Sequence, residues 1–190
     1  MPERNTGELI RTLGDDVHRC HGELLRGIED GERHADGSIT ADYGYHARQL
    51  IRAILAYIEG VTFSVKVSCI RRCDRRGLNV SVHERYAAVE RDTELSDKGE
   101  IIERPAKLRL ASNVRFALRL LERAERGRFK FDPSAGWWSD LQKTIKVRDR
   151  LTHPRMPEDI DISPDELTAA MRARRGFEDA VLLKKPRKKG

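Results

Sequence analysis

Apolar positions recur at helical spacing over much of the chain. Residues 7–29 contain one such stripe, with three- and four-residue steps, and residues 43–75 contain a longer one. The pattern predicts two long amphipathic helices, the first interrupted at Gly14, with a polar loop over residues 30–40 between them. The apolar positions are Leu9, Ile10, Leu13, Val17, Leu24, Leu25 and Ile28 in the first helix, and Leu50, Ile51, Ile54, Ile58, Val61 and Val65 in the second.

The segment VTFSVKVSCI, residues 61–70, also has features of a β-strand. Its β-branched residues alternate with other side chains, as they do in strands. The three- and four-residue spacing nevertheless continues through Gly60 into this segment, and the longer pattern favours a helix. Gly77 then ends the helix. The sequence predicts a short helix within VHERYAAVERDTEL, residues 82–95, and a connector over SDKGEIIERP, residues 96–105.

Three further helices are predicted in the second half of the chain. One lies between Pro105 and Gly127, and the next begins near Ser134 or Ala135. The last covers residues 164–182, because Ser163, Pro164 and Glu166 match an N-cap, a first-turn proline and a capping-box acid. These patterns predict an all-α protein.

Composition agrees with a helical globular protein. The 190 residues are 38% hydrophobic, 36% charged and 6% aromatic, whereas a β-sandwich would contain more β-branched and aromatic residues. The length predicts one domain, residues 1–183, followed by a basic tail over residues 184–190 that we expect to be disordered. The net charge of +6 favours weak attraction to polyanions such as nucleic acid, although an arginine-rich composition also follows from genome composition.

Three cysteines form an odd set without the spacing of a disulfide framework, which predicts a reducing compartment, by default the cytoplasm. The N-terminal segment is too charged for a signal peptide, and no run reaches the ~18 apolar residues of a membrane span. We therefore expect a protein that is neither secreted nor membrane-spanning.

No cofactor or metal site is predicted. His18, Cys20 and His21 lie close together, and Cys69 and Cys73 are one helical turn apart, but neither set has the spacing of a zinc site. Buried helical cysteines are more often small hydrophobic residues. The chain also lacks a glycine-rich phosphate loop and the GxSxG and HExxH motifs, which excludes the corresponding NTPases, hydrolases and metalloproteases.

The segment KVRDRLTHPRM, residues 146–156, places an arginine on the apolar side of its helix. With about 100° per residue and Trp137 as the origin, Arg148 falls at about 20°, inside the apolar stripe. An inward-facing guanidinium should pair with a carboxylate, cap carbonyls, or line a wet cleft or a subunit interface. The stripe is bounded by Trp138, Leu141, Ile145 and Leu151, while Lys143, Lys146 and Arg150 fall on the opposite side.

His153 lies just before Pro154, which disfavours helical geometry at the histidine. We therefore expect His153 at the helix end, where it is free to turn toward Arg148. An imidazole exchanges protons near neutral pH and a guanidinium clamps phosphate oxygens, so the pair suits phosphodiester chemistry. Two structural alternatives stay open: an ion pair for Arg148, and a C-cap for His153.

The string RDRLTHP resembles the RxxxxH motif of HEPN domains, a family of helical RNases and nucleotide-binding modules. In that family a polar residue follows the motif arginine, and Asp149 matches this position. The resemblance covers residues 104–182, with two helices around the motif and one after it. It implies an antiparallel helical bundle that pairs as a homodimer, so that two motifs meet in one cleft.

The resemblance also implies a metal-independent endoribonuclease. Its catalytic residues would be Arg148, Asp149 and His153, and it would cut single-stranded RNA to 2′,3′-cyclic phosphate and 5′-hydroxyl ends. Arg150, Arg155 and the basic tail would add affinity for the RNA backbone. The alternative is a noncatalytic HEPN-like dimerisation module that binds a nucleotide or a protein. Either protein would suit a toxin–antitoxin or phage-defence system, with an antitoxin or a regulatory protein as partner.

Overall fold

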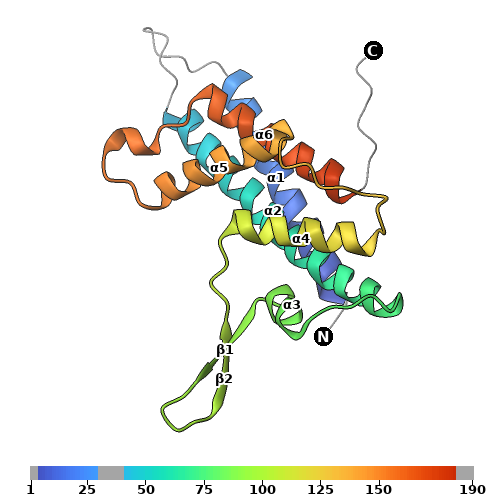
Figure 1. Ribbon diagram of the computed structural model, residues 1–190. Coiled ribbons are helices and arrows are strands. Elements are labelled where there is room, and N and C mark those ends of the chain that lie inside the picture. The colour runs from blue at the N-terminus through green and yellow to red at the C-terminus, as the bar shows by residue number, and fades with distance from the viewer. Residues whose placement is uncertain (1–3, 30–40, 183–190) are drawn as a thin grey trace.

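The computed structural model describes residues 4–29 and 41–182, which are mostly helical (Figure 1). This confirms the predicted predominance of helices. In chain order the elements are α1 (Arg4–Glu29), α2 (Ala41–Arg75), α3 (Val82–Ala88), β1 (Arg91–Leu95), β2 (Ile101–Pro105), α4 (Leu110–Ala124), α5 (Gly136–Thr152), the short 3₁₀ helix η1 (Pro157–Ile160) and α6 (Pro164–Val181). The predicted loop at residues 30–40 and the predicted tail at 184–190 lie outside the described residues.

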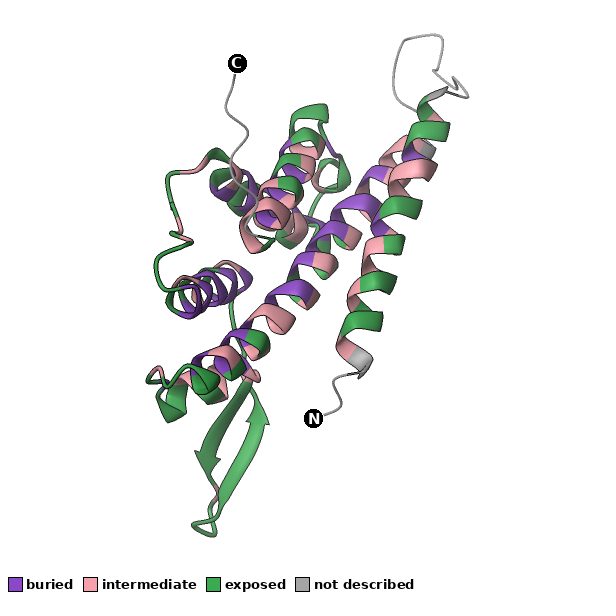
Figure 2. Cartoon of the chain, turned by 90° about the vertical axis from the view of Figure 1, so that its right-hand side faces the viewer, coloured by how far each residue is buried: buried purple, intermediate pink, exposed green. Residues whose placement is uncertain are grey.

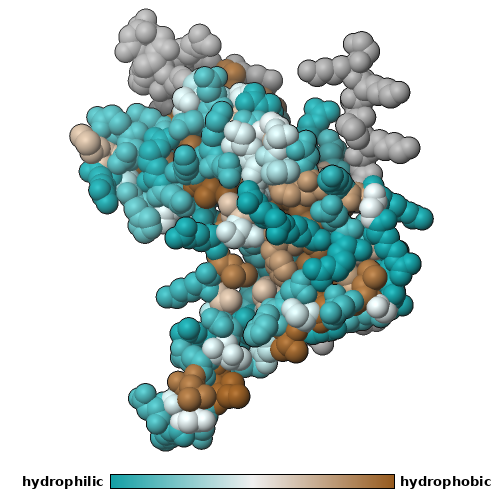
Figure 3. Space-filling model, viewed as in Figure 1, coloured by the Kyte–Doolittle hydropathy of each residue, from teal (hydrophilic) through white to brown (hydrophobic). Residues whose placement is uncertain are grey.

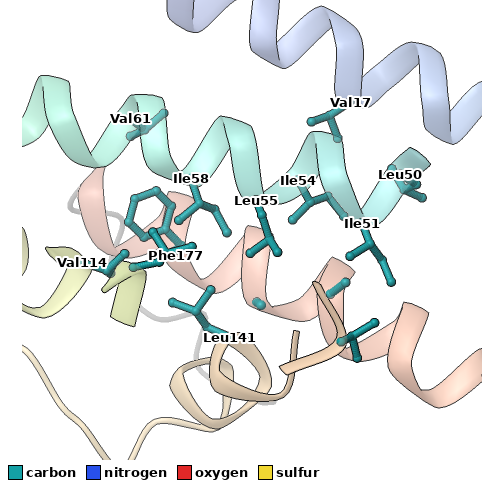
Figure 4. Packing of buried hydrophobic residues seen from close by; sticks show 14 of the residues in the cluster. Val17, Leu50, Ile51, Ile54, Leu55, Ile58, Val61, Val114, Leu141 and Phe177 are labelled. Atoms are coloured by element: carbon teal, nitrogen blue, oxygen red, sulfur yellow. The ribbon is translucent and has the colours of Figure 1, made fainter. Parts of the chain in front are cut away.

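Helix α2 is the central element of the fold. It packs against α1 along one side and against α4, α5 and α6 along the other (Figure 2). By length and composition alone α2 could cross a membrane, but here its apolar residues form the core. Figure 4 shows Ile54, Ile58 and neighbouring α2 side chains enclosed between Val17 of α1 and Phe177 of α6. Burial of these side chains supplies the main stabilisation of the bundle.

A second, smaller cluster of buried residues joins the end of α2 to α3 and α4. It includes Cys69 and Cys73, both buried, together with Val80 and Leu120. Burial raises the pKa of the Cys69 thiol to about 11, an effect that the nearby Arg72 charge only partly opposes. The two cysteines therefore act here as small hydrophobic residues.

The predicted interruption of the first helix is wrong. Helix α1 is continuous through Gly14, which packs toward Tyr57 of α2. Glycine disfavours a helix by only about 1 kcal/mol, which packing against a neighbouring helix readily offsets. The long helix through residues 61–70 is confirmed. So is the capping box of α6, in which the Glu166 N–H donates to Ser163 Oγ at 3.2 Å and the Ser163 N–H donates to a Glu166 oxygen at 2.9 Å.

Residues 91–105 form an antiparallel β-hairpin where the sequence predicted the end of a helix and a connector. The register runs from Arg91 opposite Pro105 to Leu95 opposite Ile101. Gly99, with φ of +78°, makes the turn, a conformation that glycine adopts without steric cost. Every residue of both strands is exposed, and the hairpin projects away from the helices (Figure 1). The connector expected over residues 96–105 is therefore wrong, while the mostly helical structure remains compatible with the all-α prediction.

Apolar side chains gather at the outer end of the hairpin (Figure 3). Leu95 is 72% exposed and Ile101 is 76% exposed, and they face each other across the two strands. At its base the Ala106 N–H donates to the Glu90 carbonyl at 2.8 Å, which closes the hairpin. The Glu90 carboxylate ties this base to the bundle, because it accepts hydrogen bonds from Lys66 of α2 at 2.8 Å and from Asn113 of α4 at 2.9 Å. The hairpin is thus an exposed arm on a fixed base.

Candidate functional site at the end of helix α5

Aromatic side chains fix the beginning of α5. Trp138 is buried and meets Phe131 edge to face, with 5.2 Å between ring centroids, while Trp137 lies 6.5 Å from the ring of Phe177 on α6. Such pairs stabilise beyond the area that they bury. They set the rotation of the helix about its axis, so that Leu141 points into the core (Figure 4). The same rotation positions Arg148 further along.

Arg148 lies at the border between the core and the surface, with its side chain 31% exposed. Its Nη1 donates to Glu59 Oε1 of α2 at 2.7 Å, and its Nη2 lies 3.4 Å from Asp149 Oδ1. Glu59 stands four residues after Leu55 of the core, on the exposed flank of α2. The structure thus gives the inward-tilted guanidinium a carboxylate partner from a helix far away in sequence.

His153 ends α5. It has φ of −129° and ψ of 57°, and its N–H donates to the Asp149 carbonyl at 3.2 Å, which closes the last turn. The side chain is exposed, and within residues 4–29 and 41–182 the imidazole has no hydrogen bond or ion pair. The predicted position at the helix end is confirmed. The backbone of His153 therefore serves as a cap while its imidazole stays open to solvent.

Arg148 and Asp149 are in contact, but no hydrogen bond among the described residues joins Arg148 to His153. The shared element is the final turn itself, where the Thr152 hydroxyl also donates to the Arg148 carbonyl at 2.8 Å. The end of α5 therefore presents a guanidinium, a carboxylate and an imidazole from six consecutive residues, held in place by backbone contacts and by Glu59.

The two arginines expected to bind RNA have different environments. Arg150 donates to Glu166 of α6 at 2.8 Å and to the Glu158 carbonyl of η1 at 3.2 Å, so it ties three elements together. Arg155 is exposed, and its backbone N–H donates to an Asp159 oxygen at 2.7 Å. That hydrogen bond and one from the next residue lower the pKa of Asp159. Arg155 thus has the freer side chain of the two.

Sequence reasoning missed a buried lysine. Lys66 of α2 is fully enclosed, and its Nζ donates to Asn113 Oδ1 at 2.6 Å, to Glu90 Oε1 at 2.8 Å and to the Ala87 carbonyl at 3.3 Å. Burial lowers the pKa of its ammonium group, and the hydrogen bond and charge of Glu90 partly offset this. Lys66 lies about 20° from Leu55 around α2, so the angular test that identified Arg148 would have found it.

Comparison with known proteins adds no further identification. No family model matches the sequence, and no curated protein or solved structure shows significant similarity to it. Within the described part of the chain, no group of three or more His, Cys, Asp or Glu side chains is arranged to hold a metal ion.

Proposed function

We propose that this protein is an endoribonuclease of the HEPN type that cuts single-stranded RNA without a metal ion and works as a homodimer. The observation that carries the proposal is the end of α5, where an exposed imidazole and a half-exposed guanidinium lie on one helical turn. The hydrogen bond to Glu59 orients the guanidinium of Arg148, and the imidazole of His153 is exposed to solvent. This arrangement suits a phosphate-binding group beside a proton-transfer group.

In the proposed reaction the imidazole of His153 takes the proton of a ribose 2′-hydroxyl. The resulting oxygen attacks the adjacent phosphorus, and the bond from phosphorus to the 5′-oxygen breaks. The partner subunit's His153 donates a proton to that leaving oxygen. The products are a 2′,3′-cyclic phosphate and a 5′-hydroxyl. Because acid and base act on opposite sides of one phosphate, two proton-transfer groups are needed, and a second copy of the chain would supply the second one.

Arg148 would hold the phosphate and stabilise the negative charge that develops on its oxygens. Asp149, which lies against Arg148, would orient the guanidinium. Arg155, with an exposed side chain, would contribute nonspecific affinity for the RNA backbone, as would Arg150 to the extent that Glu166 leaves it free. A nuclease of this kind would suit a toxin or a phage-defence component in the cytoplasm, controlled by an antitoxin or another protein.

The test is cleavage of single-stranded RNA in the presence of EDTA. His153→Ala should lower the rate by at least about 100-fold, the usual contribution of a general base. The matched control is His83→Ala, because His83 is also exposed and also follows an arginine, Arg76, in the sequence. Cyclic phosphate ends in the products of the parent would support the mechanism. Equal activity of the parent and His153→Ala would refute it.

A noncatalytic module is the second candidate, and one observation favours it. Arg148 already has a carboxylate partner, Glu59, within its own chain, as a purely structural arginine would. In that case the end of α5 would bind a nucleotide or a protein, and the dimer would be its working form. A parent protein that sediments as a dimer and cuts no RNA under any condition tested would favour this function.

A further inference from the structure

A cavity of about 390 Å³ opens between α4 and α5. Arg115 and Arg119 of α4 line one side, Trp138 and Gln142 of α5 line the other, and Phe116 adds apolar surface. None of the residues that line it is acidic. Its chemistry is therefore cationic and aromatic, a combination that binds phosphates and nucleobases.

The two arginines are one helical turn apart on α4 and are both exposed. Among the described residues neither has an ion pair, and like charges one helical turn apart repel each other. The Cζ of Arg115 lies 5.1 Å from the centre of the Trp138 ring. This cation–π contact holds the guanidinium against the indole and leaves its N–H groups available to an anion.

A second cavity offers a useful contrast. It has a volume of about 650 Å³, lies between α5 and α6, and is also lined by basic residues. There, however, Arg150 is paired with Glu166, and Arg172 donates twice to Asp140, at 2.8 and 3.1 Å. Its arginines are already neutralised by carboxylates of the same chain. Within the part of the chain that the structure describes, the arginines of the cavity between α4 and α5 have no carboxylate partner, which makes this cavity the better anion site.

The cavity shares a face of α5 with the proposed catalytic turn. Trp138, Gln142, Ile145 and Asp149 are spaced by four, three and four residues, which aligns them along the helix. At 1.5 Å per residue, Gln142 lies about 10 Å from Asp149 along the axis. An extended strand that occupies the cavity can therefore reach the end of α5 along this flank.

We propose that the cavity between α4 and α5 binds one backbone phosphate and the adjoining base of the same single-stranded RNA that the end of α5 cuts. Arg115 and Arg119 clamp the phosphate oxygens, and the base stacks on the free face of the Arg115 guanidinium beside Phe116. The choice of RNA as the ligand rests on the proposed function. The site lies at a distance from the bond that breaks, and it determines which stretch of the RNA strand is bound.

The test uses a fluorescent, fully 2′-O-methylated oligonucleotide of about 12 nucleotides, within the usual range for single-strand sites. This probe lacks the free 2′-hydroxyl and cannot be cut, so its binding is independent of catalysis. Arg115→Gln/Arg119→Gln should weaken binding by about ten-fold or more. The slope of log affinity against log salt should fall by about 0.7, the value for one lost phosphate contact on a single strand.

The control is Arg11→Gln/Arg19→Gln, which removes the same charge from exposed positions of α1, a helix that packs on the other side of α2 (Figure 2). Binding at the parent level in this control, with weak binding in the α4 variant, supports the site. Equal weakening in both variants, or no binding by the parent, overturns it. If the parent binds the probe through the cavity but cuts no RNA, the site stands and the nuclease proposal fails.

Discussion

The contact between α5 and α6 at Gly176 provides a sharp test of the fold that carries the site. A Cβ added to Gly176 would lie 2.9 Å from Trp137 Cδ1 and closer still to Trp137 Cβ and Cγ. Ordinary contacts of a Cβ atom begin at 3.4 Å. Because Trp137 Cβ is attached to the backbone of α5, no rotation of the tryptophan side chain can move it away. Gly176→Ala therefore forces the two helices apart.

Two opposing effects decide the size of the change in stability. Alanine favours a helix over glycine by about 1 kcal/mol. Overpacking of a close helix contact costs about 1–3 kcal/mol, and the upper end applies where the neighbouring atom cannot move. Gly176→Ala should therefore lower the free energy of unfolding by about 2 kcal/mol. Urea unfolding followed by circular dichroism at 25 °C measures this directly.

Gly22→Ala is the matched control. Gly22 also lies inside a long helix, α1, but an added Cβ would meet no atom within 4 Å. Only the helix preference remains, so this variant should be more stable than the parent by about 0.5–1 kcal/mol. The two identical substitutions should thus have opposite signs. A Gly176→Ala protein as stable as Gly22→Ala would show that α6 does not approach α5 at Trp137.

Three further results are expected. Lys66→Met should lower the free energy of unfolding in urea by about 3 kcal/mol, because it leaves the partners of a buried charge unpaired; no loss would contradict the network. Hydrogen bonds from Arg123 lower the pKa of Glu84 from its ordinary value of 4.5 to about 2. The ionised carboxylate therefore stabilises the fold fully above about pH 4.5, and this stabilisation is lost as the pH falls to about 2. Between about pH 5 and 3, the free energy of unfolding measured in urea should therefore fall less for Glu84→Gln than for the parent. An equal fall in both proteins would count against the ion pair between Arg123 and Glu84. Arg148→Lys keeps a cation for Glu59 but loses the guanidinium fork, so RNA cleavage should fall about ten-fold or more while stability changes by less than about 1 kcal/mol; unchanged cleavage would make Arg148 purely structural.

The helices could be predicted from the sequence because each of them buries one face. The stripe of α2 crosses a segment rich in β-branched residues, yet its spacing correctly predicted a helix through Val65 and Cys69. The start of α6 was equally clear, since Ser163 and Glu166 satisfy backbone groups locally. Patterns of this kind depend only on residues close in sequence, so they can be recognised without knowing how the rest of the chain folds.

The hairpin could not be predicted in the same way. An amphipathic strand is recognised by alternation between a buried and an exposed face, and here both faces of β1 and β2 are exposed. The turn at Gly99 was the available signal, but polar residues around a glycine are equally typical of a connector. What defines the hairpin is its cross-strand pairing, which leaves no buried face to detect, and the anchor of Glu90 on Lys66, which lies 24 residues earlier.

The candidate site was predictable only in part, because some of its features depend on neighbours in sequence and others on residues far away in the chain. Angular position around α5 identified Arg148 as a charged residue on an apolar arc, and Pro154 placed His153 at the helix end. The carboxylate that meets Arg148 lies 89 residues earlier, on another helix, and no local pattern indicates it. The pairing of Arg150 with Glu166 was likewise invisible, because it depends on how α6 returns along α5.

Arg148 and Lys66 are both cations on apolar arcs, and their hydrogen bonds show why only one of them suits a binding site. An ammonium group has three N–H donors, and Lys66 directs them at Asn113, Glu90 and the Ala87 carbonyl within a closed interior. A guanidinium has five N–H donors, and among the described residues Arg148 uses donors on Nη1 and Nη2 for two carboxylates. The remaining donors belong to a side chain that is 31% exposed. Lys66, whose donors are all used inside the protein, can only stabilise the fold. Arg148 is partly exposed and has unused donors, so it can also bind a phosphate.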